Sequence, residues 1–328
     1  MDILNNLGIG YTGDYLVQGS QIDKCKKSSQ LDIKYTEFCV KIDGKENFYN
    51  QISNYYFGKT IFHLPTINFN QSNLKRIKET VNEIILNDVD LFVIDASTLL
   101  YETYDWSTDE EQRNYLKNMA KGIATIVSFN KEVAIENTSF DNNSLLFGKS
   151  ISNISDLLVY TRNVLVEDFD FSRDKANKMV GVSLNINNLI KNNDIDDLED
   201  WIKVFSNDIK CFKISNVEAN IQVISKLIDL IKEYNIDKPI ILETKEEIEK
   251  INNTYKKFEY LVTNKITGKP LNFDGYRNIP ISKYNEYNSN FNSSQNGYTN
   301  IIIIGMILFT VIASILMILV EVKNWKFD

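Results

Sequence analysis

The sequence is poor in cysteine, in histidine and in positive charge, and each shortage excludes a class of protein. Its 328 residues include three cysteines, Cys25, Cys39 and Cys211, an odd number without CxxC spacing. We interpret them as reduced thiols, so neither a disulfide framework nor a zinc knuckle is expected. Lys and Arg number 36 against 44 Asp and Glu, a net charge of −8. Because phosphate binding requires a cationic face, this balance argues against nucleic acid as the main partner.

Common catalytic signatures are missing as well. The chain has no GxSxG elbow, no P-loop, no HExxH and no GxGxxG in its first turn. The beginning, MDILNNLGIG, lacks the basic start and the long apolar run of a signal peptide. Export of the large amino-terminal part is therefore not expected.

One long apolar run is present. Residues 301–320, IIIIGMILFTVIASILMILV, carry no charge. Twenty residues at a rise of about 1.5 Å span about 30 Å, the thickness of the hydrocarbon core of a bilayer. We expect a single transmembrane helix here, after an Asn/Ser-rich flexible linker at 281–300 and before a short polar tail at 321–328. The resulting tail anchor would place the domain at 1–280 in the cytoplasm, although Lys323 and Lys326 favour the opposite topology by the positive-inside rule.

Short apolar runs alternate with helical patterns from residue 7 to residue 245, and the hydrophobic content of 43% suffices for a full core. The stretch 219–235, for example, repeats apolar residues at helical spacing and stops at Asn235. This rhythm predicts a (β/α)₈ TIM barrel over residues 1–280; a doubly wound open sheet is the alternative. The expected strands are 7–12, 33–40, 59–65, 91–97, 132–138, 180–186, 209–215 and 239–244.

In such a barrel the chemistry lies at the carboxyl ends of the strands. Carboxylate and amide oxygens and the single histidine of the chain are expected there, and these are the ligand types of a metal site. A carboxylate that closes an apolar strand needs a partner or a cation, so a salt bridge from Glu136 or Glu243 to Lys213 or Lys245 is the structural alternative. The residues at the expected mouth are Glu37, His63, Asp95, Glu136, Asn137, Asn185, Asn188, Lys213, Asn216 and Glu243.

The succession FHLP, AIENT, GVSLNINN, CFKISN and IILET resembles the xylose-isomerase-like TIM barrels, a superfamily of sugar isomerases, epimerases and endonuclease-IV-type enzymes. Within it, ENT followed by LNINN is most similar to the multinuclear non-haem iron enzymes that oxidise cysteines in ribosomal peptides. Those enzymes carry a Leu-Asp-hydrophobic-Asn-Asn run at the sixth strand. The resemblance implies metal ligation by His63, Glu136 and Glu243, with Glu37 at an early acidic strand end.

Two departures from this pattern bear on the metal. The resemblance implies a metal-binding Asp where this chain has Asn185, and a His where it has Lys213. At 4 Å and an effective dielectric of about 20, a lysine would repel each unit of charge on an ion by ~4 kcal/mol. Lys213 could instead neutralise Glu136 or Glu243. Together with the single histidine, this makes a cluster of two or three irons unexpected, and GVSLNINNLI is interpreted as a decayed metal site.

Two functions follow from the sequence. The first is a membrane-anchored pseudoenzyme that binds a small sugar-like ligand or a peptide or protein partner. The second is an active isomerase or epimerase of sugars or sugar phosphates, with one divalent ion (Mn, Mg, Fe or Zn) on Glu136, Glu243 and His63. Asn185 is a weaker ligand candidate, and Lys213 would stabilise an enediolate or act as acid or base. Peptide modification is a third possibility, and DNA repair conflicts with the charge and the anchor.

Overall fold

The computed structural model describes residues 3–11, 21–39, 52–64, 79, 89–96, 109–139, 147–244 and 250–269. They belong to a compact unit that runs from Met1 to Pro270. The elements in chain order are η1 (Ile3–Asn6), β1 (Leu7–Tyr11), α1 (Gln21–Gln30), β2 (Tyr35–Cys39), α2 (Ile52–Tyr55), β3 (Lys59–His63), β4 (Leu91–Asp95), α4 (Asp109–Val127), β5 (Val133–Glu136), α5 (Ile151–Asp168), α6 (Arg173–Met179), β6 (Val180–Asn185), α7 (Ile186–Asn192), η3 (Ile195–Asp197), α8 (Leu198–Phe205), β7 (Ile209–Ser215), α9 (Ile221–Glu233), β8 (Ile240–Thr244) and α10 (Ile251–Thr267).

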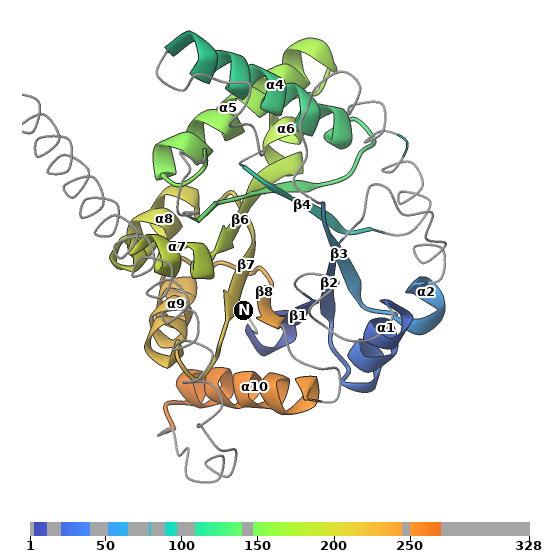
Figure 1. Ribbon diagram of the computed structural model, residues 1–328, viewed down its shortest axis with the longest axis vertical. Helices are drawn as coiled ribbons and strands as arrows, with labels where there is room; N and C mark the ends of the chain where they lie inside the picture. Colours follow the sequence, from blue (N-terminus) through green and yellow to red (C-terminus); the bar gives the residue numbers. More distant parts are fainter. Residues whose placement is uncertain are drawn as a thin grey trace, which may run out of the picture. The chain divides into compact units, whose positions relative to one another are not determined.

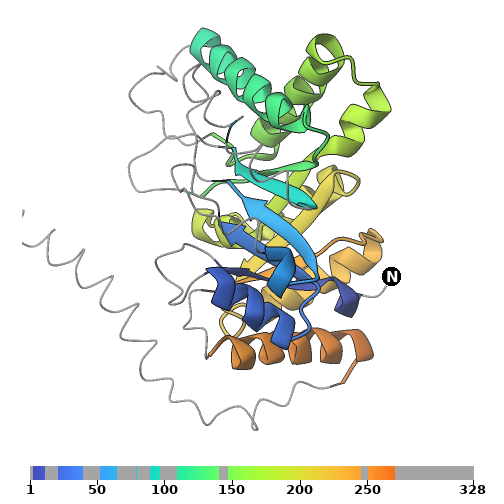
Figure 2. The same cartoon turned by 90° about the vertical axis from the view of Figure 1, so that its right-hand side faces the viewer.

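The eight strands form a closed parallel barrel in the order β1 to β8, and β8 pairs back with β1. Helices surround the strands, with α4 and α10 on opposite sides of the barrel (Figure 1). The same arrangement is seen from the side in Figure 2. All eight expected strands are present within a few residues of their predicted bounds, so the barrel is confirmed and the open sheet is excluded.

The outer helices bury one stripe of apolar side chains against the barrel. In α8 these are Leu198, Trp201, Ile202 and Phe205, which follow the i, i+3, i+4, i+7 spacing of an amphipathic helix. Ser150 begins α5 as an N-cap by accepting a hydrogen bond from the backbone N–H of Asn153. Helix periodicity and capping are local signals, which explains why the sequence predicts these elements.

Turns in the described part use the abundant asparagine of this chain. Every non-glycine residue with a positive φ in that part is Asn or Asp, the side chains that tolerate the left-handed conformation best. Asn235 is one of them, and α9 ends two residues before it, as expected from the sequence. The full set is Asp32, Asn130, Asp170, Asn193, Asn216 and Asn235.

The predicted linker and apolar segment lie outside the described residues. Among the helices of the described ranges, none is long and apolar enough to cross a bilayer. The transmembrane helix at 301–320 therefore stays a prediction from the sequence.

Candidate active site at the carboxyl ends of the strands

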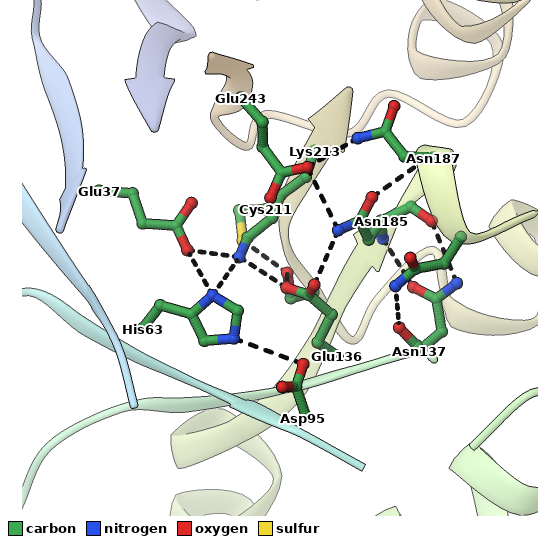
Figure 3. Close-up of polar contacts among 12 residues, drawn as sticks. Glu37, His63, Asp95, Glu136, Asn137, Asn185, Asn187, Cys211, Lys213 and Glu243 are labelled. Atoms are coloured by element: carbon green, nitrogen blue, oxygen red, sulfur yellow. Dashed lines mark hydrogen bonds and ion pairs between the residues drawn. The ribbon is translucent and has the colours of Figure 1, made fainter. Parts of the chain in front are cut away.

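Two layers of side chains fill the interior of the barrel. Because neighbouring residues of a strand point to opposite faces, every second residue faces inward. The inner side chains below the mouth are apolar and pack as a single cluster: Ile61, Leu91, Val93, Ala134, Cys211 and Ile241, with Tyr35 against it. Two residues after six of them, Leu91 excepted, come the polar residues of the mouth. The residues predicted at the strand ends therefore lie together at one end of the barrel (Figure 3): Glu37, His63, Asp95, Glu136, Lys213 and Glu243.

Lys213 lies at the centre of this polar layer and is 0% exposed. Its Nζ atom forms an ion pair with Glu136 Oε2 at 2.6 Å and another with Glu37 Oε1. Both carboxylates are buried, which strengthens their attraction to the ammonium. The predicted salt bridge between Glu136 and Lys213 is thus present, and Glu37, expected only to line the mouth, is a second anionic partner.

Gly10 on β1 makes room for one of these partners. A Cβ atom at Gly10 would lie 2.9 Å from Glu37 Oε2 and 3.0 Å from the Cγ2 atom of Ile241. Both distances are shorter than ordinary carbon contacts. The absence of a side chain here allows the Glu37 carboxylate to enter the barrel interior.

His63 lies between two carboxylates. Its Nδ1 atom is 3.2 Å from Glu37 Oε1, and its Nε2 atom is 3.4 Å from Asp95 Oδ1, a charge contact more than a well-formed hydrogen bond. Burial and the Lys213 charge lower the pKa of His63, but Asp95 and Glu136 outweigh them and raise it well above 6.5. The Nδ1 atom also lies 3.3 Å from Lys213 Nζ, so the imidazole and the ammonium share Glu37 as a partner.

Glu136 is almost saturated as an acceptor. Its Oε2 atom accepts hydrogen bonds from Ser183 Oγ at 3.1 Å and from Lys213, and its Oε1 atom accepts from Asn185 Nδ2 at 2.8 Å. A carboxylate offers about four lone-pair positions, so about one remains. Ser183, which the sequence analysis did not single out, contributes because it lies directly opposite Glu136 in the pairing of β5 with β6.

Asn185 turns its nitrogen, and not its oxygen, toward the carboxylates. Its Nδ2 atom contacts Glu136 and lies 3.4 Å from Glu243 Oε2, while its Oδ1 atom accepts the backbone N–H of Asn187 at 3.1 Å. The orientation is fixed chemically, because carboxylates only accept and a backbone N–H only donates. Asn185 is thereby the N-cap of α7 and presents no oxygen for metal ligation in this arrangement.

Asn187 ties three strand ends together and was missed in the sequence analysis. Its Nδ2 atom donates to Glu243 Oε2 at 2.7 Å, and its Oδ1 atom accepts from the backbone N–H of Ser215 at 2.8 Å. The signal available in the sequence was its place two residues after Asn185, where the strand runs directly into a helix. A polar side chain at such a corner can reach the neighbouring strand ends.

The remaining asparagines have structural partners. Asn137 clamps the backbone of Asn185 through both atoms of its amide, at 2.6 and 3.1 Å, and Asn188 donates to the carbonyl of Asn137. Asn216 is exposed and adopts a left-handed conformation with φ 50° at the turn after β7. These three residues therefore stabilise the turns at the mouth. Within the described part of the chain, none of their side-chain hydrogen bonds involves a titratable group.

Burial and neighbouring charges shift the pKa values of three carboxyl groups of the mouth, Glu37, Asp95 and Glu243. Burial is the largest effect on Glu243 and, with the charges of Glu136 and Glu37, raises its pKa to about 7 against the lowering by Lys213. Burial also raises the pKa of Glu37, but Lys213 and His63 overcome this and bring it to about 2. Against burial, His63 lowers the pKa of Asp95. The mouth therefore holds charged groups beside one carboxyl group that titrates near neutrality.

A candidate metal site can be formed from three of these residues. His63, Asp95 and Glu136 each offer one donor atom, and these atoms lie within 4.8 Å of one another. One imidazole and two carboxylates suit several divalent ions, so the donor types do not identify the metal. This triad contains Asp95 in place of the predicted ligand Glu243. Lys213 and the raised pKa of His63 oppose its use, since a metal needs an unprotonated nitrogen.

No protein-family model and no curated protein matches the chain. The fold does match solved structures. A 3-keto-D-glucoside 4-epimerase from E. coli matches 79% of this chain and 99% of its own, with a TM-score of 0.54 and 11% identity. An AP endonuclease of family 2 from Brucella melitensis matches 74% and 95%, with a TM-score of 0.55 and 11% identity. A xylose isomerase-like TIM barrel protein from Mycobacterium smegmatis in complex with magnesium matches 81% and 100%, with a TM-score of 0.51 and 7% identity. The chain therefore has the fold of the xylose-isomerase-like TIM barrels.

Proposed function

We propose that this protein is a membrane-anchored binding barrel that holds a small polyhydroxylated ligand at its carboxyl mouth and performs no metal-dependent reaction. The observation that carries the proposal is the pairing at the mouth. Lys213 pairs with both Glu37 and Glu136 in the buried floor, while Asp95 and His63 retain side-chain exposures of 27% and 17% above it. The Asp95 carboxylate, an acceptor above a floor of paired charges, suits a ligand rich in hydroxyl donors.

The comparison with a 3-keto-D-glucoside epimerase supports the ligand class, because that protein shares the fold and its name specifies a sugar substrate. Ligands of such barrels bind at the carboxyl ends of the strands, where this polar cluster lies. A peptide or protein partner at the same mouth is the alternative occupant expected from the sequence.

Calorimetric titration of the full chain in detergent micelles tests the proposal. The panel contains neutral hexoses and polyols, sugar phosphates and cysteine-containing peptides. We expect a neutral sugar or polyol to bind and Asp95→Asn to weaken its binding by about tenfold, the loss of one charged hydrogen bond. Asp229→Asn is the matched control, because Asp229 is 58% exposed and pairs with Lys265 on an outer helix. Binding that Asp95→Asn leaves unchanged would contradict this mouth as the site.

A metal-dependent isomerase or epimerase is the second candidate function. The observation in its favour is the triad of His63, Asp95 and Glu136 within 4.8 Å. These residues would hold one divalent ion, which would polarise a substrate carbonyl when bound, and Lys213 would hold a proton at Nζ beside Glu136. Under this function Glu136→Gln abolishes metal binding and turnover together, whereas unchanged activity in that variant rules the function out.

Membrane attachment through 301–320 is a separate part of the proposal and rests on the uncharged apolar run. We expect the full chain to float with lipid vesicles and to resist carbonate extraction, and a chain without residues 301–328 to be released. Protease added outside intact cells should leave the barrel uncut, as expected for a cytoplasmic domain. Cleavage from outside would reverse the topology, in line with Lys323 and Lys326.

A further inference from the structure

The environment of Lys213 is built for a permanent cation. No part of the side chain is exposed, and its Nζ atom contacts oxygen atoms of Glu37 on β2 and Glu136 on β5, strands that are not neighbours of β7. An ammonium group carries three hydrogen-bond donors and no acceptor, so it matches these carboxylates. The ion pairs cross the interior of the barrel and fix the ammonium near its centre.

This ammonium competes directly with a divalent ion. Glu136 belongs to the triad that could hold a metal, and Lys213 Nζ lies 2.6 Å from its Oε2 atom. The same Nζ atom lies 3.3 Å from Nδ1 of His63, another member of the triad. A metal bound by the triad would therefore stand close to a buried positive charge that already uses one of its ligands.

Asn185 acts in the same direction. It points its Nδ2 donor at Glu136 Oε1 and Glu243 Oε2. As a metal ligand, Asn185 would have to present its oxygen at this position instead. Its own oxygen is engaged by the backbone of Asn187. The two side chains together direct hydrogen-bond donors at Glu37, Glu136 and Glu243.

We propose that Lys213, supported by Asn185, is the resident cation of the barrel mouth and excludes divalent metal ions from it. The inference deepens the proposed function, on which its biological meaning rests. Metal content is measured without any ligand, so the two proposals can fail separately.

Elemental analysis of the full chain, purified in detergent without chelator or affinity histidines, tests the proposal. The wild-type chain is expected to contain no stoichiometric Mn, Fe, Zn or Mg, before or after titration with each ion. The double substitution Asn185→Asp with Lys213→His replaces two donors by a carboxylate and an imidazole next to Glu136 and Glu243. This variant is expected to gain about one ion per chain, because it supplies the ligand types that divalent ions prefer.

The matched control applies the same two chemical changes away from the mouth. Lys210 lies on the same strand and pairs with Glu132, and Asn177 is exposed on α6. The combination Asn177→Asp with Lys210→His is expected to leave the chain free of metal. Metal binding by this control as strong as that of the mouth variant would overturn the assignment to Lys213 and Asn185.

Two further results would overturn the proposal. One is stoichiometric metal in the wild-type chain that disappears in His63→Ala, which would favour the isomerase. The other is a folded mouth variant that still takes up no metal. If the mouth variant does not fold, the melting temperature of the wild-type chain decides: no rise with Mn²⁺ or Zn²⁺ supports the proposal, and a rise that is absent in His63→Ala refutes it.

Discussion

Lys213 and Glu136 form an ion pair of 2.6 Å in which the lysine side chain is 0% exposed and the glutamate side chain 3% exposed. Two charges taken out of water in this way are costly unless they compensate each other. Glu37 supplies a second anion, and Ser183 and Asn185 each donate a further hydrogen bond to Glu136. The polar layer is therefore one interdependent network, and the removal of any member should be felt by the others.

Lys213→Met is expected to lower the free energy of unfolding by about 3–5 kcal/mol, because it removes the buried cation that pairs with both Glu37 and Glu136. Chemical denaturation of the full chain measures the change. Glu136→Gln in the same background should recover part of the loss, since it removes one unpaired charge. The matched control is Lys265→Met, which breaks an exposed pair with Asp229 and should cost no more than about 1 kcal/mol. Equal costs for the two lysines would contradict the network.

Asn187→Asp is expected to destabilise the fold by about 1–3 kcal/mol, because it replaces the donor that faces Glu243 by an acceptor. Adding Glu243→Gln should restore stability, since the new amide can donate to the new carboxylate. Asn177→Asp, the same change at an exposed position, should stay within about 0.5 kcal/mol of the wild type. Failure of the second substitution to rescue the first would argue against the contact.

Stability should fall as the pH rises from about 4.5 to about 7, because the raised pKa of Glu243 makes the folded chain hold a proton that the unfolded chain releases over this window. Glu243 accounts for at most about 3 kcal/mol of this loss. The raised pKa of His63 acts with the same sign above its ordinary value of 6.5. Denaturation at several pH values should give a smaller slope for Glu243→Gln than for the wild type; identical slopes would remove Glu243 as the cause.

Glu37 acts in the opposite sense, because its pKa is lowered to about 2 and its stabilising effect is lost as the pH falls below 4.5.

Gly10→Ala is expected to cost about 1–3 kcal/mol, the usual range for overpacking a filled interior. The new Cβ atom would lie 2.9 Å from Glu37 Oε2 and should push this carboxylate away from Lys213. If so, the cost is smaller in a Lys213→Met background, where the position of Glu37 no longer matters. Strict additivity of the two substitutions would show that Gly10 acts by packing alone.

The sequence by itself determined the barrel fold and the end of the barrel at which the polar residues lie. Short apolar runs marked strands such as Val180–Asn185, and helical spacing marked the segments between them. Since parallel strands in a closed barrel all end at one face, naming the residue at each strand end sufficed to place Glu37, His63, Asp95, Glu136, Lys213 and Glu243 together.

Only the tertiary structure decided which of these residues are partners. Lys213 and Glu37 are 176 positions apart, on strands that do not adjoin, and they meet because the barrel closes at a radius their side chains can span. The same closure puts Asp95, and not Glu243, in the candidate metal triad. A register shift of one strand would change which residues of that strand meet their partners, while the sequence pattern would stay the same. That pattern indicates the face that a residue occupies and not the residue opposite it.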